Sequence, residues 1–419
     1  MFRFFRARQA QSSHPSKSST QSLPNVNCGV TSTLPDRGQL NIPLADVKAE
    51  DLAARDAIGR GRTLARQDRW AELSRQMRAA DKNRAAAPDG TPIADLLAFG
   101  ARSDVVLAVE HALSDGNALC EYDLLGGISE LEDEMRAHPD DAMIALVVAL
   151  THIDLAWAWR GTATDATLPP LHRSRCAAHF DRAAALLPKC RAALPDSPIV
   201  AAASCALLAG QRKASLRVAD EYERLISLDP NNQRHMRAMG THLLPRWFGS
   251  YAELEVQALR NAARTHDIWG AGGYTWVQFD AITLDEEACA RLDVEYFLEG
   301  LYDILHHRPD QQTVNMLSAY CAITIQNGPR QNEKAETVRA QIHEAAHGLI
   351  RDHMTELHPM IWAHAANGFN NSVRINSAER FAARGQRDAL RAIGDLFREE
   401  LLSGMDVTFT PSGLRLSQH

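Results

Sequence analysis

The sequence lacks the patterns that would place the protein in a functional class at once. Its seven cysteines are odd in number, widely spaced and contain no C-x-x-C pair, which is neither a disulfide framework nor a zinc-ribbon spacing. No window approaches eighteen apolar residues, so we predict no transmembrane helix. The basic start, MFRFFRARQ, is not followed by the apolar region of a secretory signal. Together these absences favour a cytoplasmic location.

An excess of positive charge is also missing. The formal net charge is −7, and residues 1–45 carry +4 of it, so residues 46–419 carry −11. A body of that sign has no electrostatic reason to bind nucleic acid or an anionic membrane. Hydrophobic content of 45% and charged content of 23% are typical of a folded globular chain. At 419 residues, we expect several domains or one elongated array.

Strand signals are scarce, and most of the chain has helical periodicity. Residues 1–44 are rich in Ser, Gln, Asn, Pro and Thr without periodicity, which predicts a disordered tail. Residues 45–404 are predicted to form a helical repeat domain, in which the apolar stretch 141–160 lies between neighbouring helices. In residues 405–419, two short β-type runs flank Pro-Ser-Gly and predict a β-hairpin extension.

Proline next to Asp or Asn marks the boundaries between the predicted helices. Proline ends the earlier helix, and the Asp or Asn side chain accepts hydrogen bonds from the first N–H groups of the next. Four such turns occur, at residues 139–140, 195–196, 229–232 and 309–310.

One short pattern occurs twice, 181 residues apart. Ile58-Gly59 is followed after ten residues by Trp-Ala-Glu-Leu at 70–73, and Met239-Gly240 is followed after ten residues by Tyr-Ala-Glu-Leu at 251–254. Each copy places a glycine in one predicted helix and an alanine in the next. Small residues at a fixed spacing let two helices approach closely, so we expect Gly240 and Gly59 to lie at helix–helix contacts, with Ala252 and Ala71 opposite them.

The spacing resembles that of the tetratricopeptide repeat family, whose 34-residue unit is a pair of antiparallel helices. With Ile199 as position 1, Ala206 falls at position 8, Tyr222 at 24 and Pro230 at 32. In the next unit Gly240 is at position 8 and Ala252 at 20. The agreement covers roughly residues 50–80 and 199–264. The resemblance implies an all-α fold, a tetratricopeptide-like α-solenoid of antiparallel helix pairs.

Solenoids of this kind hold extended peptides in a concave groove, so the resemblance implies a protein-interaction module without catalysis or cofactor. The partner-binding candidates are Arg246, Trp247, Tyr274 and Trp276, because aromatic side chains and arginine make good anchors. Phe248, Trp269 and Phe279 belong to the same aromatic group. The competing interpretation is core packing, since aromatic residues at helical spacing usually fill interiors.

A second hypothesis comes from the segment HEAAH at residues 343–347, which resembles the active-site helix of the zincin metalloproteases. That resemblance would make His343 and His347 zinc ligands and Glu344 the general base, with His353 at the position of the third histidine of the metzincins. The rival function is therefore a zinc-dependent hydrolase with zinc as cofactor.

The sequence around HEAAH favours a polar face on a repeat helix instead. Ile350 stands where the metzincins need a glycine, and the apolar stripe from Val338 through Ile342 to Leu349 predicts an unbroken helix. On such a helix His353 cannot close a site with the other two histidines. The Gly-Ala-Gly-Gly run at 270–273 lacks the Lys-Ser/Thr of a phosphate loop, and we interpret it as a tight turn between helices.

Overall fold

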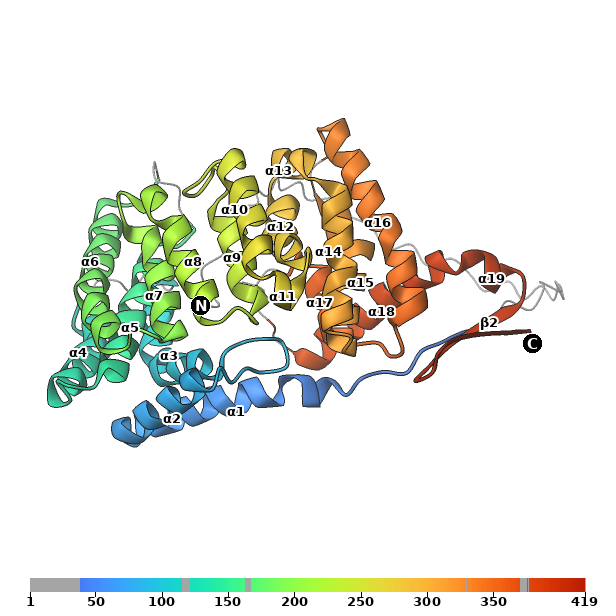
Figure 1. Ribbon diagram of the computed structural model, residues 1–419. Coiled ribbons are helices and arrows are strands. Elements are labelled where there is room, and N and C mark those ends of the chain that lie inside the picture. The colour runs from blue at the N-terminus through green and yellow to red at the C-terminus, as the bar shows by residue number, and fades with distance from the viewer. Residues whose placement is uncertain are drawn as a thin grey trace, which may run out of the picture.

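The structure is a computed structural model that describes residues 38–114, 121–162, 167–328, 330–369, 375 and 377–418. The described chain is mostly helical, which confirms the predicted all-α character. Figure 1 shows the helices in an elongated row from α4 and α6 at one end to α16, α18 and a small sheet at the other, with α1 along one side. Residues 1–37 of the predicted tail lie outside the described residues.

The first part of the row is built from long helices: α1 (Val47–Arg66), α2 (Trp70–Lys82), α3 (Ile93–Ser114), α4 (Glu121–Ala137), α5 (Ala142–Arg160), α6 (Pro170–Ala193), α7 (Pro198–Leu207) and α8 (Val218–Leu228). Short 3₁₀ turns follow α7 at Leu208–Gly210 and Ala214–Leu216.

The second part contains α9 (Gln233–His242), α10 (Tyr251–Arg264), α11 (His266–Trp269), α12 (Gly272–Leu284), α13 (Glu286–Arg291), α14 (Val294–His307), α15 (Gln311–Ala322), α16 (Glu333–His353), α17 (Pro359–Ala365), α18 (Ala378–Leu396) and α19 (Arg398–Leu402). A 3₁₀ turn at Thr324–Asn327 follows α15.

The predicted turns do separate helices, and side chains within or directly after them begin the next helix. Asp310 accepts a hydrogen bond from Thr313 N at the start of α15, and Asn232 accepts one from Arg234 N at the start of α9. In the other two turns, the side chain that accepts these hydrogen bonds belongs to the residue after the predicted aspartate. Asp141 caps α5 in this way, and Ser197 caps α7. These side chains satisfy N–H groups that have no partner within the helix.

Helix α5 is long and apolar enough to cross a membrane by length and composition, although no transmembrane helix was predicted from the sequence. In the fold, 83% of its most apolar window is buried, because α5 packs against α3 and α6. It therefore lies between neighbouring helices, as the sequence predicted. The described part of the chain has no second helix of this kind.

Two apolar cores follow one another along the row and meet at α7. The first holds buried side chains of α1 to α7, among them Trp70 and Trp159. The second runs from α7 to the sheet and contains Trp269, Trp276 and Trp362. Ile199 on α7 belongs to the first core and Cys205 on the same helix to the second. Because both cores use α7, the row is one continuous packed body.

The sheet joins the two ends of the described chain. The predicted hairpin is present as β2 (Met405–Thr410) and β3 (Gly413–Gln418), which pair antiparallel. The two residues of β1 (Leu40–Asn41) pair parallel with β2, and Leu44 forms an isolated bridge with Leu357. The sequence assigned residues 38–44 to a disordered tail, and that boundary is wrong. Backbone pairing with β2 holds this segment, which hydrophobic periodicity could not reveal.

The packing prediction holds for Gly240 and fails for the other three small residues. A Cβ on Gly240 would overlap the carbonyl oxygen of Val277, so α9 and α12 touch backbone to backbone at this point. A Cβ on Gly59 would meet nothing within contact distance. Ala71 and Ala252 are exposed on α2 and α10 and oppose neither glycine. The tight contact of α1 instead lies two residues on, where Gly61 meets the backbone of Leu97 on α3.

Candidate functional site

The four partner-binding candidates separate into two buried and two surface residues. Tyr274 and Trp276 on α12 are 0% and 1% exposed, and the Tyr274 hydroxyl donates to Glu255 on α10. Core packing therefore describes these two side chains, which present no surface to a partner in this fold. Arg246 is exposed and Trp247 half-buried, both in the connection between α9 and α10.

Trp247 belongs to an aromatic cluster that bridges the two cores. Its ring lies 6.4 Å from that of Trp157 on α5 and 5.7 Å from that of His242 on α9, between ring centroids. Phe248 completes the group at 5.4 Å from His242. The Trp247 ring therefore packs mainly against these aromatic neighbours, and only part of it reaches the surface.

The HEAAH segment lies in the middle of α16, which continues without a break to His353, as the apolar stripe predicted. The His343 ring bonds through Nδ1 to the Cys321 carbonyl oxygen at 3.0 Å, and the His347 ring packs 5.9 Å from Phe397. Within the described residues, no three His, Cys, Asp or Glu side chains form a group that could hold a metal ion. Zinc binding through His343, Glu344 and His347 therefore stays an untested alternative.

The glycine-rich run at 270–273 begins with the predicted turn, at residues 270–271, and its last two glycines are the first residues of α12. Gly270 has a positive φ of 55° and ends α11, and Ala271 N donates to Asp303 Oδ2 at 2.7 Å. A carboxylate thus already occupies the N-terminal end of α12, where a bound phosphate would have to lie.

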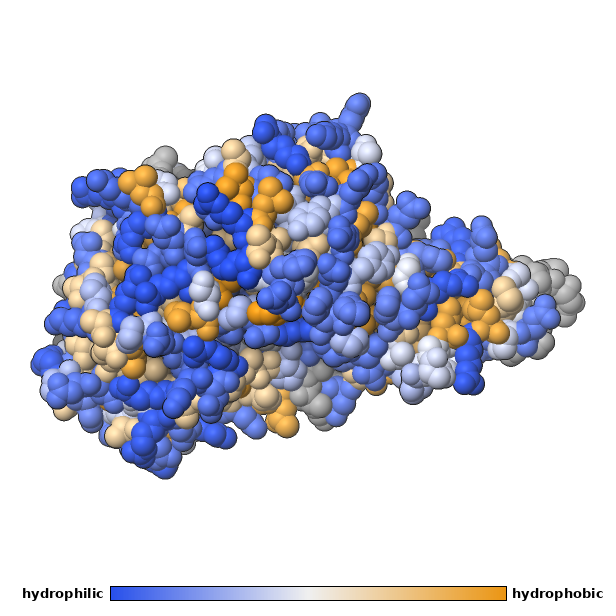
Figure 2. All heavy atoms as spheres, in the orientation of Figure 1, coloured by the Kyte–Doolittle hydropathy of each residue, from blue (hydrophilic) through white to orange (hydrophobic). Residues whose placement is uncertain are grey.

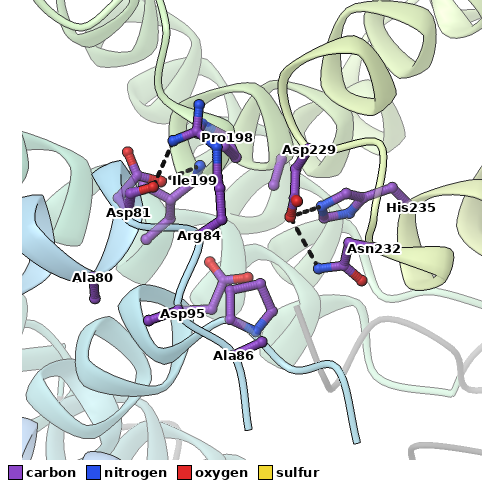
Figure 3. A pocket seen from close by; sticks show the side chains of 13 residues that line it. Ala80, Asp81, Arg84, Ala86, Asp95, Pro198, Ile199, Asp229, Asn232 and His235 are labelled. Atoms are coloured by element: carbon purple, nitrogen blue, oxygen red, sulfur yellow. Dashed lines mark hydrogen bonds and ion pairs between the residues drawn. The ribbon is translucent and has the colours of Figure 1, made fainter. Parts of the chain in front are cut away.

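The best-formed pocket lies where α2, α3, α7 and the α8–α9 turn meet (Figure 3). Its empty volume, including the part open to solvent, is about 330 Å³. Because that figure includes open solvent, it does not measure a ligand cavity; the cavity proper is only about 20 Å³, room for little more than the tip of one side chain. Three aspartates, one arginine and one histidine give it its charge: Asp81, Asp95, Asp229, Arg84 and His235.

Asp81 and Arg84 join α2 to the turns of the repeat array. Asp81 Oδ1 accepts a hydrogen bond from Ile199 N in the first turn of α7. Burial raises the pKa of Asp81, and the carboxylate of Asp95 acts in the same direction. Arg84 directs its guanidinium to backbone oxygens: Nε donates to Leu228 O at 3.0 Å and Nη2 to Asp196 O at 3.1 Å. The positive φ of Arg84, 51°, aims the side chain into this junction.

On the opposite wall, Asp229 pairs with His235 and Asn232 (Figure 3). His235 Nε2 lies 3.3 Å from Asp229 Oδ2, and Asn232 Nδ2 donates to the same oxygen at 3.2 Å. Burial alone would raise the pKa of Asp229, but the hydrogen bond and charge of His235 outweigh it, and the pKa is lowered. This carboxylate is therefore ionised and already shared between two neighbours.

The pocket as a whole is short of positive charge. The Arg84 guanidinium already donates hydrogen bonds to backbone carbonyl oxygens, and His235 already pairs with the Asp229 carboxylate. Asp95, in the first turn of α3, makes no hydrogen bond with any described residue, and the nearby Arg234 guanidinium interacts with its charge. An open carboxylate next to a second, buried one favours a cation in the space between them. The pocket can therefore bind and orient a positively charged group, and nothing in it resembles a nucleophile with its base.

Sequence reasoning did not identify this pocket, although a signal was present. Asp229 and Asn232 belong to one of the four proline turns, and Pro198 follows a second one. Those residues were interpreted only as helix boundaries. That α2 and α3 reach the same turns from more than a hundred residues away could not be inferred from spacing.

Comparison with protein-family models, with curated proteins and with solved structures finds no match to this chain. The tetratricopeptide resemblance of the sequence therefore stays a resemblance, and function has to be argued from the fold and the pocket.

Proposed function

We propose that the protein is a helical-repeat interaction module of the α-solenoid type, which binds a peptide or protein partner through a basic side chain held in the acidic pocket. The observation that carries this proposal is the half-buried Asp95 carboxylate, without a hydrogen-bond partner among the described residues, beside Asp81 and Asp229 in a small pocket that opens to solvent. A lysine or arginine of the partner would supply the missing cation and donate hydrogen bonds to Asp95.

The arrangement of helices is consistent with this role. Helices pack on their neighbours along an elongated row, and the start of α7 and the α8–α9 turn line the pocket. Repeat arrays of this kind present long continuous surfaces to extended partners. The net charge of −7 also draws basic segments towards the protein at low salt. All five described free cysteines are buried, and a cytoplasmic location remains the prediction.

The test uses the full chain and an array of peptides with randomised flanks and one fixed central residue. We expect binding when the centre is Lys or Arg and none when it is Glu or Gln. Asp95→Asn should weaken binding of the best basic peptide roughly tenfold, the effect of losing one hydrogen bond to a charged group. Asp220→Asn, which removes an exposed carboxylate on α8, is the matched control and should leave binding unchanged.

Equal binding of basic and acidic peptides would overturn the proposal. So would an Asp95→Asn variant that keeps full affinity while its melting temperature matches that of the native protein. Because Asp95 lies in the first turn of α3, we expect the variant to lose only about 0.3–1 kcal/mol of stability, from its favourable position at the helix N-terminus.

A further inference from the structure

The small sheet has two edge strands of unequal length, the two-residue β1 and the six-residue β3. On one side, β2 pairs with β1 through Val407 N, which donates to Gln39 O at 2.8 Å. On the other side β3 is the outermost strand, and no described residue pairs with its outer edge. A strand in this position presents a row of backbone N–H and C=O groups that bond to water in the monomer and that another extended chain can pair with.

The register fixes which residues of β3 carry those groups. Val407 turns its N–H towards β1 and away from β3, so its cross-strand partner Leu416 also turns its N–H and C=O outward. The same alternation gives Leu414 and Gln418 the same orientation. Three residues in alternate positions are thus ready to pair with a strand added at this edge.

The apolar face of the sheet also ends at this edge without cover. Val407 and Phe409 on β2 are buried, and Leu416 and Leu414 lie across from them on the same face. Leu416 is nevertheless 38% exposed, and Leu402 on the neighbouring α19 is 54% exposed. Figure 2 shows an apolar patch on this end of the molecule, beside α19 and β2 of Figure 1.

The strand carries none of the usual protection against pairing with another chain. Residues 413–418 read GLRLSQ, with one charge and no proline, and β3 has the same length as β2. Natural edge strands are commonly interrupted by proline, by several charges or by a bulge. Figure 1 shows the hairpin projecting at the C-terminal end of the row, and α16 is the helix that contacts β3.

We propose that the outer edge of β3 binds a second copy of this chain, β3 against β3, antiparallel and related by a twofold axis at Leu416. In that register Leu416 faces its equivalent and Leu414 faces Gln418, so every outward backbone group is paired. Arg415 faces Ser417 of the other copy, so no like charges meet. The two three-stranded sheets become one of six strands, and the exposed leucines cover each other.

The self-complementarity of this register is the reason to choose a second copy over an unrelated peptide. A second β3 strand offers the same alternation of leucines. It also places a neutral residue opposite the single charge and leaves no outward backbone group without a hydrogen bond. The contact is small compared with a standard protein interface, so we expect a weak dimer whose population rises with concentration.

The test is sedimentation velocity on the full chain across the micromolar range. We expect the native protein to shift from monomer to dimer as its concentration rises. Leu416→Lys places a charge at the centre of the contact and should abolish the dimer. Leu259→Lys changes a comparably exposed leucine on α10 and should leave the dimer intact, which separates edge pairing from general apolar association.

A cysteine at the twofold axis gives a second readout, which does not depend on whether the fold tolerates the Leu416→Lys substitution. Facing residues of a hydrogen-bonded antiparallel pair have Cα atoms about 5.5 Å apart, within the range that a disulfide spans. Leu416→Cys should therefore cross-link two chains on oxidation, whereas Leu259→Cys and the native protein should not. A native protein that stays monomeric at all concentrations, or a dimer that survives Leu416→Lys, would overturn the proposal.

Discussion

The two copies of the glycine–alanine pattern are alike in sequence and different in what they pack. In the second copy, Gly240 brings α9 against the backbone of α12. In the first, Gly59 faces open space, and Gly61 makes the close contact with α3. What the copies share is the leucine in the first turn of the following helix, since Leu73 and Leu254 are both buried. The leucine was the reliable part of the pattern, and the glycine was not.

The aromatic residue that begins α2 and α10 provides the largest expected contrast between the copies. Trp70 is buried in the first core, whereas Tyr251 is half-buried beside Arg291. We expect Trp70→Ala to cost about 3–5 kcal/mol of unfolding free energy, because it leaves a large cavity. Tyr251→Ala should cost about 1 kcal/mol. Urea unfolding followed by circular dichroism measures both, and equal losses would show that the two helices are buried alike.

The next contrast concerns the glycines themselves. Gly240→Leu should destabilise the fold by about 3 kcal/mol, because its side chain has to displace the backbone of α12 at Val277. Gly59→Leu, the same change at the equivalent position, starts from a Cβ position with no neighbour and should not lower the melting temperature. An unaffected Gly240→Leu variant would contradict the backbone contact between α9 and α12.

A fall in pH should also destabilise the helices of the second copy more than those of the first. His242 ends α9, and burial lowers its pKa from 6.5 to about 4. Because the folded state holds this ring neutral, its contribution to stability is complete above about pH 6.5 and is lost as the pH falls towards 4. The loss is about 3 kcal/mol, from a shift of about 2.5 pKa units. Helices α1 and α2 contain no histidine, so the first copy has no comparable dependence.

The measurement is unfolding free energy between about pH 7.5 and about pH 4.5 for the native protein and for His242→Gln. The variant should be less stable at neutral pH, because the ring bonds to the Tyr222 hydroxyl at 2.8 Å, and it should lose less stability on acidification. Burial lowers the pKa of His179 to about 4 as well, so part of the dependence should remain in the variant. Parallel curves for the two proteins would show that His242 does not titrate with unfolding.

The all-α character, the four proline turns and the C-terminal hairpin could be predicted from the sequence, because each depends on residues close together in the chain. Asp310 and Asn232 begin helices next to the prolines that marked them. Long-range contacts could not be predicted. Nothing local indicates that Gly61 meets α3 and Gly59 does not, since the two differ only in which side of α1 they occupy.

The pocket was missed for the same reason. Asp81, Asp95 and Asp229 are distant in sequence and converge only because the loop after α2 reaches the turn after α8 through Arg84. The aromatic candidates show the opposite error. Tyr274 and Trp276 were noticed for their chemistry, and that same apolar area buries them in the core.

The smallest effect we expect is a gain in stability. Gly59 is exposed in the interior of α1, and a Cβ there meets no neighbour. Gly59→Ala should therefore stabilise the protein by about 0.5–1 kcal/mol, since alanine restricts the unfolded chain and favours the helix. Gly240→Ala, with the same intrinsic preference, should instead destabilise it, because even one methyl group overlaps the Val277 carbonyl oxygen. A gain in stability for Gly59→Ala together with a loss for Gly240→Ala would establish that the two copies differ in packing. A loss at both positions would mean that Gly59 has a close neighbour after all.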